Sequence, residues 1–213
     1  MSTPAWTDIT SEEALSALLG EPTAAARDKE RTTLTEVDRD WLAATPFCVL
    51  GTADAEGRCD VSPKGDPAGQ LVHVIDDQTI AIAERPGNRR ADGYRNILAN
   101  PHVGLNFLIP GRGDTLRING RARLVSDAPF FEEMVVKGHR PLLAVVVEIE
   151  TIFFHCAKAF LRSQLWQPES WNPDGTVPRR AVLAHRLERP DTPLEELDAY
   201  YGESYKDGLY VQP

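Results

Sequence analysis

A succession of short β-strand patterns between residues 47 and 154 limits the possible folds more than any other feature of this sequence. The runs are rich in strand-forming residues and are separated by turn sequences such as Asp54–Gly57 and Pro110–Asp114. Strand patterns cover 47–52, 58–62, 71–75, 79–83, 102–109, 115–125 and 142–154, with one helical pattern, 88–98, inserted after the fourth. Few strand–helix–strand units occur, which disfavours a doubly wound parallel sheet. The sequence predicts a mainly β protein with flanking helices, built on an antiparallel barrel of about six strands.

Helical patterns flank the strands on both sides. A capping box at Thr10–Glu13 predicts the start of one helix, a second is expected over 24–31, and Thr35 is expected to cap a third. In that third helix three side chains are expected to face inward, Val37, Trp41 and Leu42. Further helices are expected at 128–136 and 156–165, and one more near 193–200 with Thr192 as its cap. This order predicts a helical extension over 1–45, a barrel over 46–166 and a C-terminal extension over 167–213.

Charge and composition exclude several function classes. The 213 residues carry a net charge of −9, which argues against a general nucleic-acid binder. No apolar run approaches the roughly 20 residues of a membrane helix, and the N-terminus lacks a secretory pattern, so we expect a cytoplasmic protein without a membrane partner. The histidines never occur at metal-ligand spacing, so no metal site is predicted. The three cysteines, Cys48, Cys59 and Cys156, are interpreted as small buried apolar side chains in a reducing compartment.

An arginine-rich segment follows the fourth strand pattern. Glu84–Arg90 opens the inserted helix, and four arginines, Arg85, Arg89, Arg90 and Arg95, fall within eleven residues of an acidic protein. Free N–H groups at a helix start and planar guanidinium groups are the donors that a phosphate needs. The segment is therefore either a phosphate site or a solvated helix start with surface arginines.

Two other segments are candidates for a binding site. Ser62–Asp66 ends a strand with a hydroxyl and an ammonium group, and Pro63 places that strand at an edge or a bulge because proline cannot donate to a ladder. Lys158 and Arg162 share a helix face, and Ser163 and Trp166 follow them. Taken alone, Ser62–Asp66 could also be the end of a strand followed by a charged turn. Trp166 could either lie in the core or cover a flat ring of a ligand.

The combined order of these motifs resembles that of the pyridoxamine 5′-phosphate oxidase-like superfamily, the FMN-binding split barrels. The segments that carry the resemblance are Ser62–Asp66, Arg85–Arg89, Asn100–Leu105 and Thr115–Ala122. The resemblance covers about Trp41 to Trp166, and it is narrower to an uncharacterised bacterial branch described as probable FMN-dependent enzymes. It implies a six-stranded antiparallel split barrel, and a homodimer with FMN at the interface.

The same resemblance implies roles for individual residues. The FMN phosphate would be held by Asn88, Arg89 and Arg90, with Arg85 nearby, and Arg95 would be structural. The strand that contains Val61, Ser62 and Pro63 would lie along the isoalloxazine ring, and Lys64 would reach the ring or the ribityl-phosphate end. Arg162, Ser163 and Trp166 would approach the flavin from the C-terminal part of the barrel, of the same or the partner subunit.

One departure from the family pattern bears on activity. True pyridoxamine phosphate oxidases end with an arginine- and histidine-bearing motif, whereas this chain ends Asp207–Pro213 without it. The sequence therefore predicts an FMN-dependent oxidoreductase other than a true pyridoxamine phosphate oxidase, with NADH or NADPH as a possible partner and no identifiable catalytic residue. A non-catalytic flavin-binding or storage protein, and a related barrel that uses a deazaflavin or haem, stay open as alternatives.

Overall fold

In a computed structural model, which describes residues 6–210, the chain forms two compact units, Met1–Glu30 and Arg31–Pro213. The first unit contains α1 (Glu12–Leu19) and α2 (Ala24–Arg27), and no described residue of either helix is buried. Ser11, rather than Thr10, caps α1, because the Ser11 hydroxyl accepts the Ala14 N–H at 3.2 Å. The predicted capping box is therefore misplaced by one residue, and the predicted second helix is shorter than expected.

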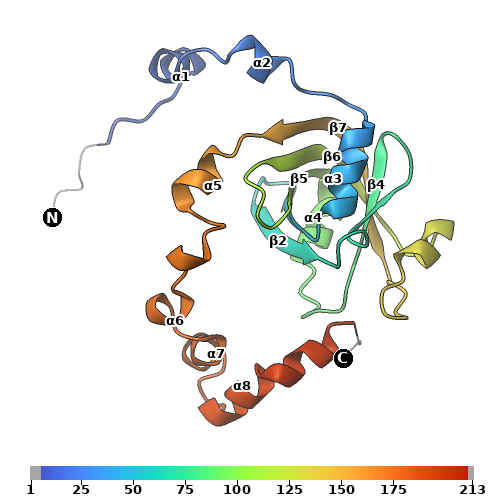
Figure 1. The fold of residues 1–213 in the computed structure, drawn as a ribbon, viewed down its shortest axis with the longest axis vertical. Helices are drawn as coiled ribbons and strands as arrows, with labels where there is room; N and C mark the ends of the chain where they lie inside the picture. Colours follow the sequence, from blue (N-terminus) through green and yellow to red (C-terminus); the bar gives the residue numbers. More distant parts are fainter. Residues whose placement is uncertain (1–5, 211–213) are drawn as a thin grey trace. The chain divides into compact units, whose positions relative to one another are not determined.

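The second unit is built on one antiparallel sheet (Figure 1). Its strands are β1 (Phe47–Ala53), β2 (Cys59–Gly65), β3 (Val72–Val74), β4 (Thr79–Ala83), β5 (His102–Leu108), β6 (Thr115–Val125) and β7 (Ala144–His155). Their order is β2-β1-β5-β6-β7-β4-β3, and in the described chain the end strands β2 and β3 do not pair with each other. The fold is consistent with the expected split barrel. In the described chain the sheet has seven strands rather than about six, because each of the seven strand patterns, 71–75 included, forms a strand.

The helices of this unit are α3 (Glu36–Ala44), α4 (Asp92–Ala99), α5 (Lys158–Ser163), α6 (Pro173–Thr176), α7 (Arg180–Leu187) and α8 (Leu194–Tyr200), with three 3₁₀ helices, η1 (Pro129–Met134), η2 (Pro168–Ser170) and η3 (Glu203–Gly208). The capping box at Thr35 is confirmed. The segment expected as an α-helix over 128–136 is the 3₁₀ helix η1, and α7 was not predicted. Thr192 does not cap α8, whose cap position is Pro193. None of the described helices has the length and hydropathy of a membrane span.

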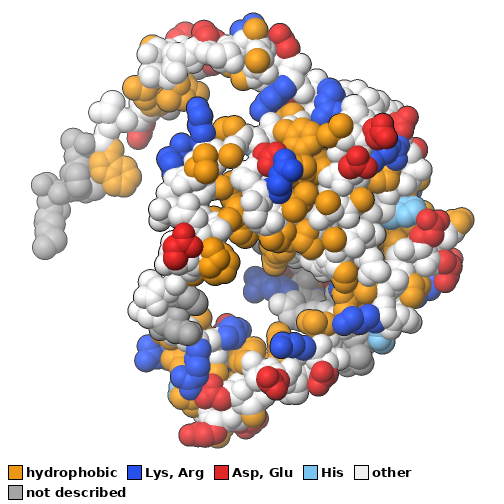
Figure 2. Space-filling view, viewed as in Figure 1, with side chains coloured by type: hydrophobic (Ala, Val, Ile, Leu, Met, Phe, Trp, Pro, Cys, Tyr) orange, Lys and Arg blue, Asp and Glu red, His pale blue; other side chains and the backbone are white. Residues whose placement is uncertain are grey.

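The main hydrophobic core lies inside the sheet and is closed by α3 and α4. Trp41 and Leu42 of α3 are buried as expected, whereas Val37 is 64% exposed and faces solvent. Ile97 of α4 joins the same core. In β6, side-chain alternation predicts inward positions for Leu116, Ile118, Ala122 and Leu124; the first three are buried and Leu124 is half-buried. On the viewed surface, hydrophobic side chains gather over the sheet among scattered acidic and basic side chains (Figure 2).

A β-bulge in β6 explains one glycine of the motif at 115–122. The register between β6 and β7 shifts between Asn119 and Gly120. A Cβ atom at Gly120 would lie 2.0 Å from the Glu148 carbonyl oxygen, so no larger residue fits without moving backbone.

The expectation of three buried cysteines was wrong for two of them. Cys48 is buried, whereas Cys59 and Cys156 are exposed. Burial raises the pKa of the Cys48 thiol to about 12, although the nearby charge of Lys64 opposes the shift. Cys59 is exposed because it begins an edge strand on the face that points away from the core.

Candidate functional site

A cavity of about 730 Å³ lies where the sheet is open, between the edge strand β2 and the end of β4. Its walls are the length of β2 from Asp60, the loop from Glu84 to Ala91, the first turn of α4 and the C-terminal residues Leu209 and Tyr210. Its volume falls in the range of about 300–1,000 Å³ that small-molecule sites occupy. Two of the three candidate segments from the sequence therefore meet in one cavity.

Strand β2 forms the first wall because its polar side chains face inward. Residues opposite each other in an antiparallel pair share a face of the sheet, and Ser62 and Lys64 are opposite the core residues Leu50 and Cys48. The alternate residues Val61 and Pro63 face outward, and Val61 is 70% exposed. The strand was expected to break at Ser62 but continues through Pro63 to Gly65, and its predicted edge position is confirmed.

Lys64 does not project freely into the cavity. Its ammonium group lies 2.6 Å from the Tyr94 hydroxyl and 3.3 Å from the Glu84 carboxylate, and Tyr94 also donates to Glu84. These contacts join β2, the end of β4 and α4. Sequence reasoning missed Glu84 and Tyr94 as cavity residues, although Glu84 is the first residue of the arginine-rich segment.

Arg85 is also held by protein groups. Its Nε donates to Asp66 at 2.7 Å and its other guanidinium nitrogen donates to the Met134 carbonyl at 2.9 Å. The side chains of Arg85 and Asp66 are 12% and 2% exposed, so this is a largely buried ion pair. Leaving Asp66 unpaired at this depth would be costly, which fixes Arg85 on the carboxylate. Arg85 lines the cavity but is engaged in the fold.

The loop before α4 forms the second wall, and it differs from the expected helix start. The helix begins at Asp92 rather than at Asn88, because Arg89 and Ala91 have left-handed backbone conformations, with φ of 58° and 57°. The Asn88 side chain accepts the Arg90 N–H at 3.0 Å, which makes a turn rather than a helix cap. Non-glycine residues in this region carry strain that is frequent at ligand sites.

The two loop arginines are exposed, unlike Arg85. Arg90 pairs with Asp92, whose carboxylate raises the pKa of the Arg90 guanidinium, mainly through their hydrogen bond. Arg89 is exposed at the rim of the cavity. Arg95 donates to the Arg90 carbonyl and contacts Asp92, which agrees with its predicted structural role.

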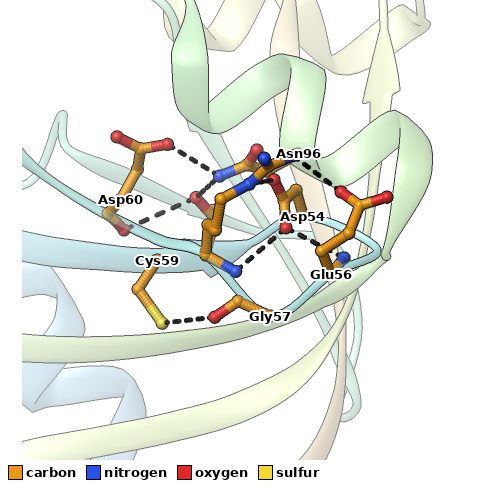
Figure 3. Close-up of polar contacts among 8 residues, drawn as sticks. Asp54, Glu56, Gly57, Cys59, Asp60 and Asn96 are labelled. Carbon is orange, nitrogen blue, oxygen red and sulfur yellow. Dashed lines mark hydrogen bonds and ion pairs between the residues drawn. The ribbon is translucent and has the colours of Figure 1, made fainter.

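Helix α4 is attached to the β1–β2 hairpin, and this attachment positions the loop. The buried Asn96 amide donates to Asp60 at 2.9 Å, as Figure 3 shows, and to the Thr52 hydroxyl at 3.1 Å. The hairpin turn is itself closed by Asp54, which accepts the backbone N–H groups of Glu56 and Arg58. Two walls of the cavity are therefore linked through α4.

The third candidate segment lies outside this cavity. The Trp166 indole N–H donates to the Arg112 carbonyl at 2.6 Å and its ring stacks on Phe160, and the Ser163 hydroxyl donates to the Phe160 carbonyl. Arg162 is exposed on α5. The structure brings together the predicted residues of β2 and the loop, but it does not bring these three residues to the same cavity of the same chain.

The residues that line the cavity fit an anionic, planar ligand such as FMN by the chemistry of their donors. Arginine and asparagine side chains of the loop can donate to a phosphate, and the hydroxyl of Ser62 and the backbone of an edge strand can bond ring heteroatoms. The described residues contain no cluster of His, Cys, Asp or Glu that could hold a metal ion.

Comparisons with known proteins give a family model and several similar folds. The model described as pyridoxamine 5′-phosphate oxidase matches residues 34–156. No curated protein sequence matches the chain. Among solved structures, HupZ from Group A Streptococcus is 19% identical, with 57% of this chain and 93% of HupZ covered and a TM-score of 0.46.

Two further structures are similar to a comparable share of the chain. A Lactobacillus delbrueckii protein, described as a candidate pyridoxamine 5′-phosphate oxidase, is 24% identical over 58% of this chain and 95% of its own, with a TM-score of 0.45. An FMN-binding protein from Syntrophomonas wolfei is 16% identical over 56% of this chain and 89% of its own, with a TM-score of 0.43.

Proposed function

Because the chain belongs to the pyridoxamine 5′-phosphate oxidase family, whose model matches residues 34–156, we propose that it binds FMN in the cavity between β2 and the loop before α4 and acts as an oxidoreductase. The observation that carries this proposal is the meeting of Ser62–Lys64 and Asn88–Arg90 on one cavity of about 730 Å³. When bound, FMN supplies two-electron transfer between organic substrates, nicotinamides or oxygen.

In this proposal each wall has its own task. Asn88, Arg89 and Arg90 hold the phosphate, since their loop presents exposed cations and amide donors. Val61, Ser62 and Pro63 lie along the ring, and Lys64 holds positive charge beside it. Arg85 orders the junction through Asp66 rather than binding the phosphate directly.

We also propose that the protein is a homodimer with the flavin at the interface. The outer face of the sheet edge supports this, because Phe47 and Val61 are 37% and 70% exposed on neighbouring strands. Arg162, Ser163 and Trp166 would then reach the flavin of the partner subunit. Light scattering should give about twice the chain mass of 23.6 kDa for the wild type, and the mass of a single chain for Val61→Glu. A monomeric wild type would contradict the dimer.

The cofactor assignment is tested by spectrum and titration. The purified protein should be yellow, or should become so with added FMN, and it should bind FMN more tightly than riboflavin. Arg89→Ala should weaken FMN binding about 30-fold without changing riboflavin binding, because a charge-assisted hydrogen bond to phosphate is lost. Arg123→Ala, an exposed arginine of β6 outside the cavity, is the matched control. If the purified protein is colourless and does not bind FMN but does bind a deazaflavin or haem, the cofactor assignment changes to that group.

A non-catalytic flavin-binding protein is the second candidate. The mutual contacts of Lys64, Glu84 and Tyr94 favour this candidate, because the polar groups of these residues at the cavity bind one another instead of a substrate. Anaerobic addition of NADH or NADPH separates the two candidates. Loss of the oxidised flavin absorbance supports the oxidoreductase, and an unchanged spectrum with both nicotinamides supports flavin binding alone.

A further inference from the structure

Tyr210, the last residue that the structure describes, lies at the cavity although it is distant in sequence from the other walls. Its hydroxyl donates to Asp66 at 2.8 Å, so the Asp66 carboxylate receives Tyr210 on one oxygen and Arg85 on the other. Burial, followed by the hydrogen bond to Asp66, raises the pKa of the Tyr210 phenol, so this hydroxyl stays protonated as a donor. The contact attaches the end of the chain to the end of β2.

The Tyr210 ring is also surrounded by cations. The Arg85 guanidinium lies 5.8 Å and the Lys137 ammonium 5.4 Å from the ring centroid, and the His139 ring stacks on it at 6.3 Å. These contacts come from the loop after β4 and from the segment between η1 and β7. Two chain segments therefore contact the ring, in addition to the hydrogen bond between the Tyr210 hydroxyl and Asp66.

A second pocket of about 240 Å³ is also lined by Tyr210. It is lined by the segment from Gly138 to Leu142 and shares Glu84, Arg85, Pro86 and Tyr210 with the larger cavity. Of these shared residues, Glu84, Arg85 and Pro86 lie in the segment that directly follows β4, whereas Tyr210 reaches the boundary from the C-terminus. Tyr210 is therefore the shared lining residue that comes from outside the segment after β4.

We propose that Tyr210 is a specificity-determining residue of this site, which separates the proposed flavin cavity from the second pocket and limits the size of the substrate beside the ring. This inference rests on the proposed FMN function. It commits the site to compact, planar electron acceptors of the quinone class, because Tyr210 and Leu209 present an aromatic ring and an alkyl chain at this end of the cavity. A reduced flavin bound here would supply a hydride to the quinone, water would supply the proton, and the products would be the hydroquinone and oxidised flavin.

The first measurement needs no catalysis. Hydrogen exchange of the peptide that contains Leu209 and Tyr210 is followed in the protein without added flavin. Tyr210→Phe should exchange about tenfold faster than the wild type, because it loses the hydrogen bond to a charged acceptor. The control is Tyr205→Phe, since Tyr205 packs on Tyr200 and Tyr201 and does not line the cavity. Equal exchange in Tyr210→Phe and the wild type would overturn the attachment of the C-terminus.

The second measurement tests size selection. The FMN-loaded protein is reduced with dithionite and mixed anaerobically with p-benzoquinone or its di-tert-butyl derivative, and flavin reoxidation is followed by stopped flow. The wild type should prefer the small quinone, and Tyr210→Ala should lower that preference about tenfold. Tyr205→Ala should keep the wild-type preference.

The outcomes separate this inference from the proposed function. If the wild type binds FMN and is reoxidised by quinones, but Tyr210→Ala keeps the same ratio of rates, the role of Tyr210 is overturned and FMN binding stands. If titration shows no FMN binding to the wild type, the proposed function and this inference both fail.

Discussion

Two pairs of basic residues surround the cavity, and they differ in what holds them. Lys64 and Arg85 form the inner pair, with side chains that are 16% and 12% exposed and that bind Glu84 and Asp66. Arg89 and Arg90 form the outer pair on the loop, and the Arg90 side chain is 77% exposed. Arg85 and Arg90 are the same residue type in one segment, yet the side chain of the Arg85 partner Asp66 is 2% exposed and that of the Arg90 partner Asp92 is 32% exposed.

The difference shows why the number of arginines in a segment is a poor guide to a ligand site. A buried carboxylate such as Asp66 needs its cation, so Arg85 is held in one place whether or not a ligand is present. An exposed ion pair such as Arg90–Asp92 contributes little and can be exchanged for a ligand phosphate. The exposed Arg90 can therefore exchange its partner for a ligand, whereas the inner pair supports the walls.

The largest expected effect comes from removing an inner cation. Arg85→Ala leaves Asp66 buried without its partner, so the free energy of unfolding should fall by about 3–5 kcal/mol in urea denaturation. Arg90→Ala should unfold at the same urea concentration as the wild type. Equal losses of unfolding free energy in Arg85→Ala and Arg90→Ala would contradict the distinction between the inner and outer pairs.

The reverse pattern is expected for ligand binding. The double variant Arg89→Ala/Arg90→Ala should bind FMN about a hundredfold more weakly and no longer prefer FMN over riboflavin, because the phosphate loses two charged donors. Its urea midpoint should be unchanged. Fluorescence titration measures both affinities, and a retained preference for FMN would move the phosphate site away from the outer pair.

A smaller effect is expected at the attachment of α4. Asn96→Ala removes the bonds to Asp60 and Thr52 and should cost about 1–2 kcal/mol of unfolding free energy. Asn96→Ala should also weaken FMN binding severalfold, since the loop that carries Arg89 and Arg90 directly precedes α4. Leu98→Ala on the exposed face of α4 is the control for both measurements. Unchanged FMN affinity in Asn96→Ala would mean that the loop is positioned without this bond.

The smallest effect concerns the inner lysine. If Lys64 stabilises the negative charge of the reduced ring, Lys64→Ala should lower the two-electron midpoint potential of bound FMN by about 30 mV, which corresponds to about 1.4 kcal/mol. Spectroelectrochemical titration measures the potential, with Lys206→Ala of η3 as the control. An unchanged potential would count against any electrostatic role of Lys64 on the ring.

Local sequence patterns were sufficient for the sheet and for the general position of the site. The bounds of β4 and β6 agree with the strand patterns, and Pro63 correctly placed β2 at an edge. These features depend on the alternation of side chains along a strand and on the missing N–H donor of proline. Both can be read from residues that are close together in the sequence. The two segments that line the cavity were identified from their side-chain chemistry, the hydroxyl and ammonium groups of one and the arginines of the other.

The roles of individual side chains were decided by the tertiary structure. The turn at Arg89 and Ala91 moved the helix start to Asp92, and no local pattern indicated it. Tyr210 reaches Asp66 from 144 positions away, and that contact depends on how the whole chain packs. By itself the sequence determined a strand at an edge or a bulge and a basic loop, and the structure showed that the two meet on one cavity. Only the packed structure determined which cations lie beside buried carboxylates, because burial of a charge is a property of all the segments around it.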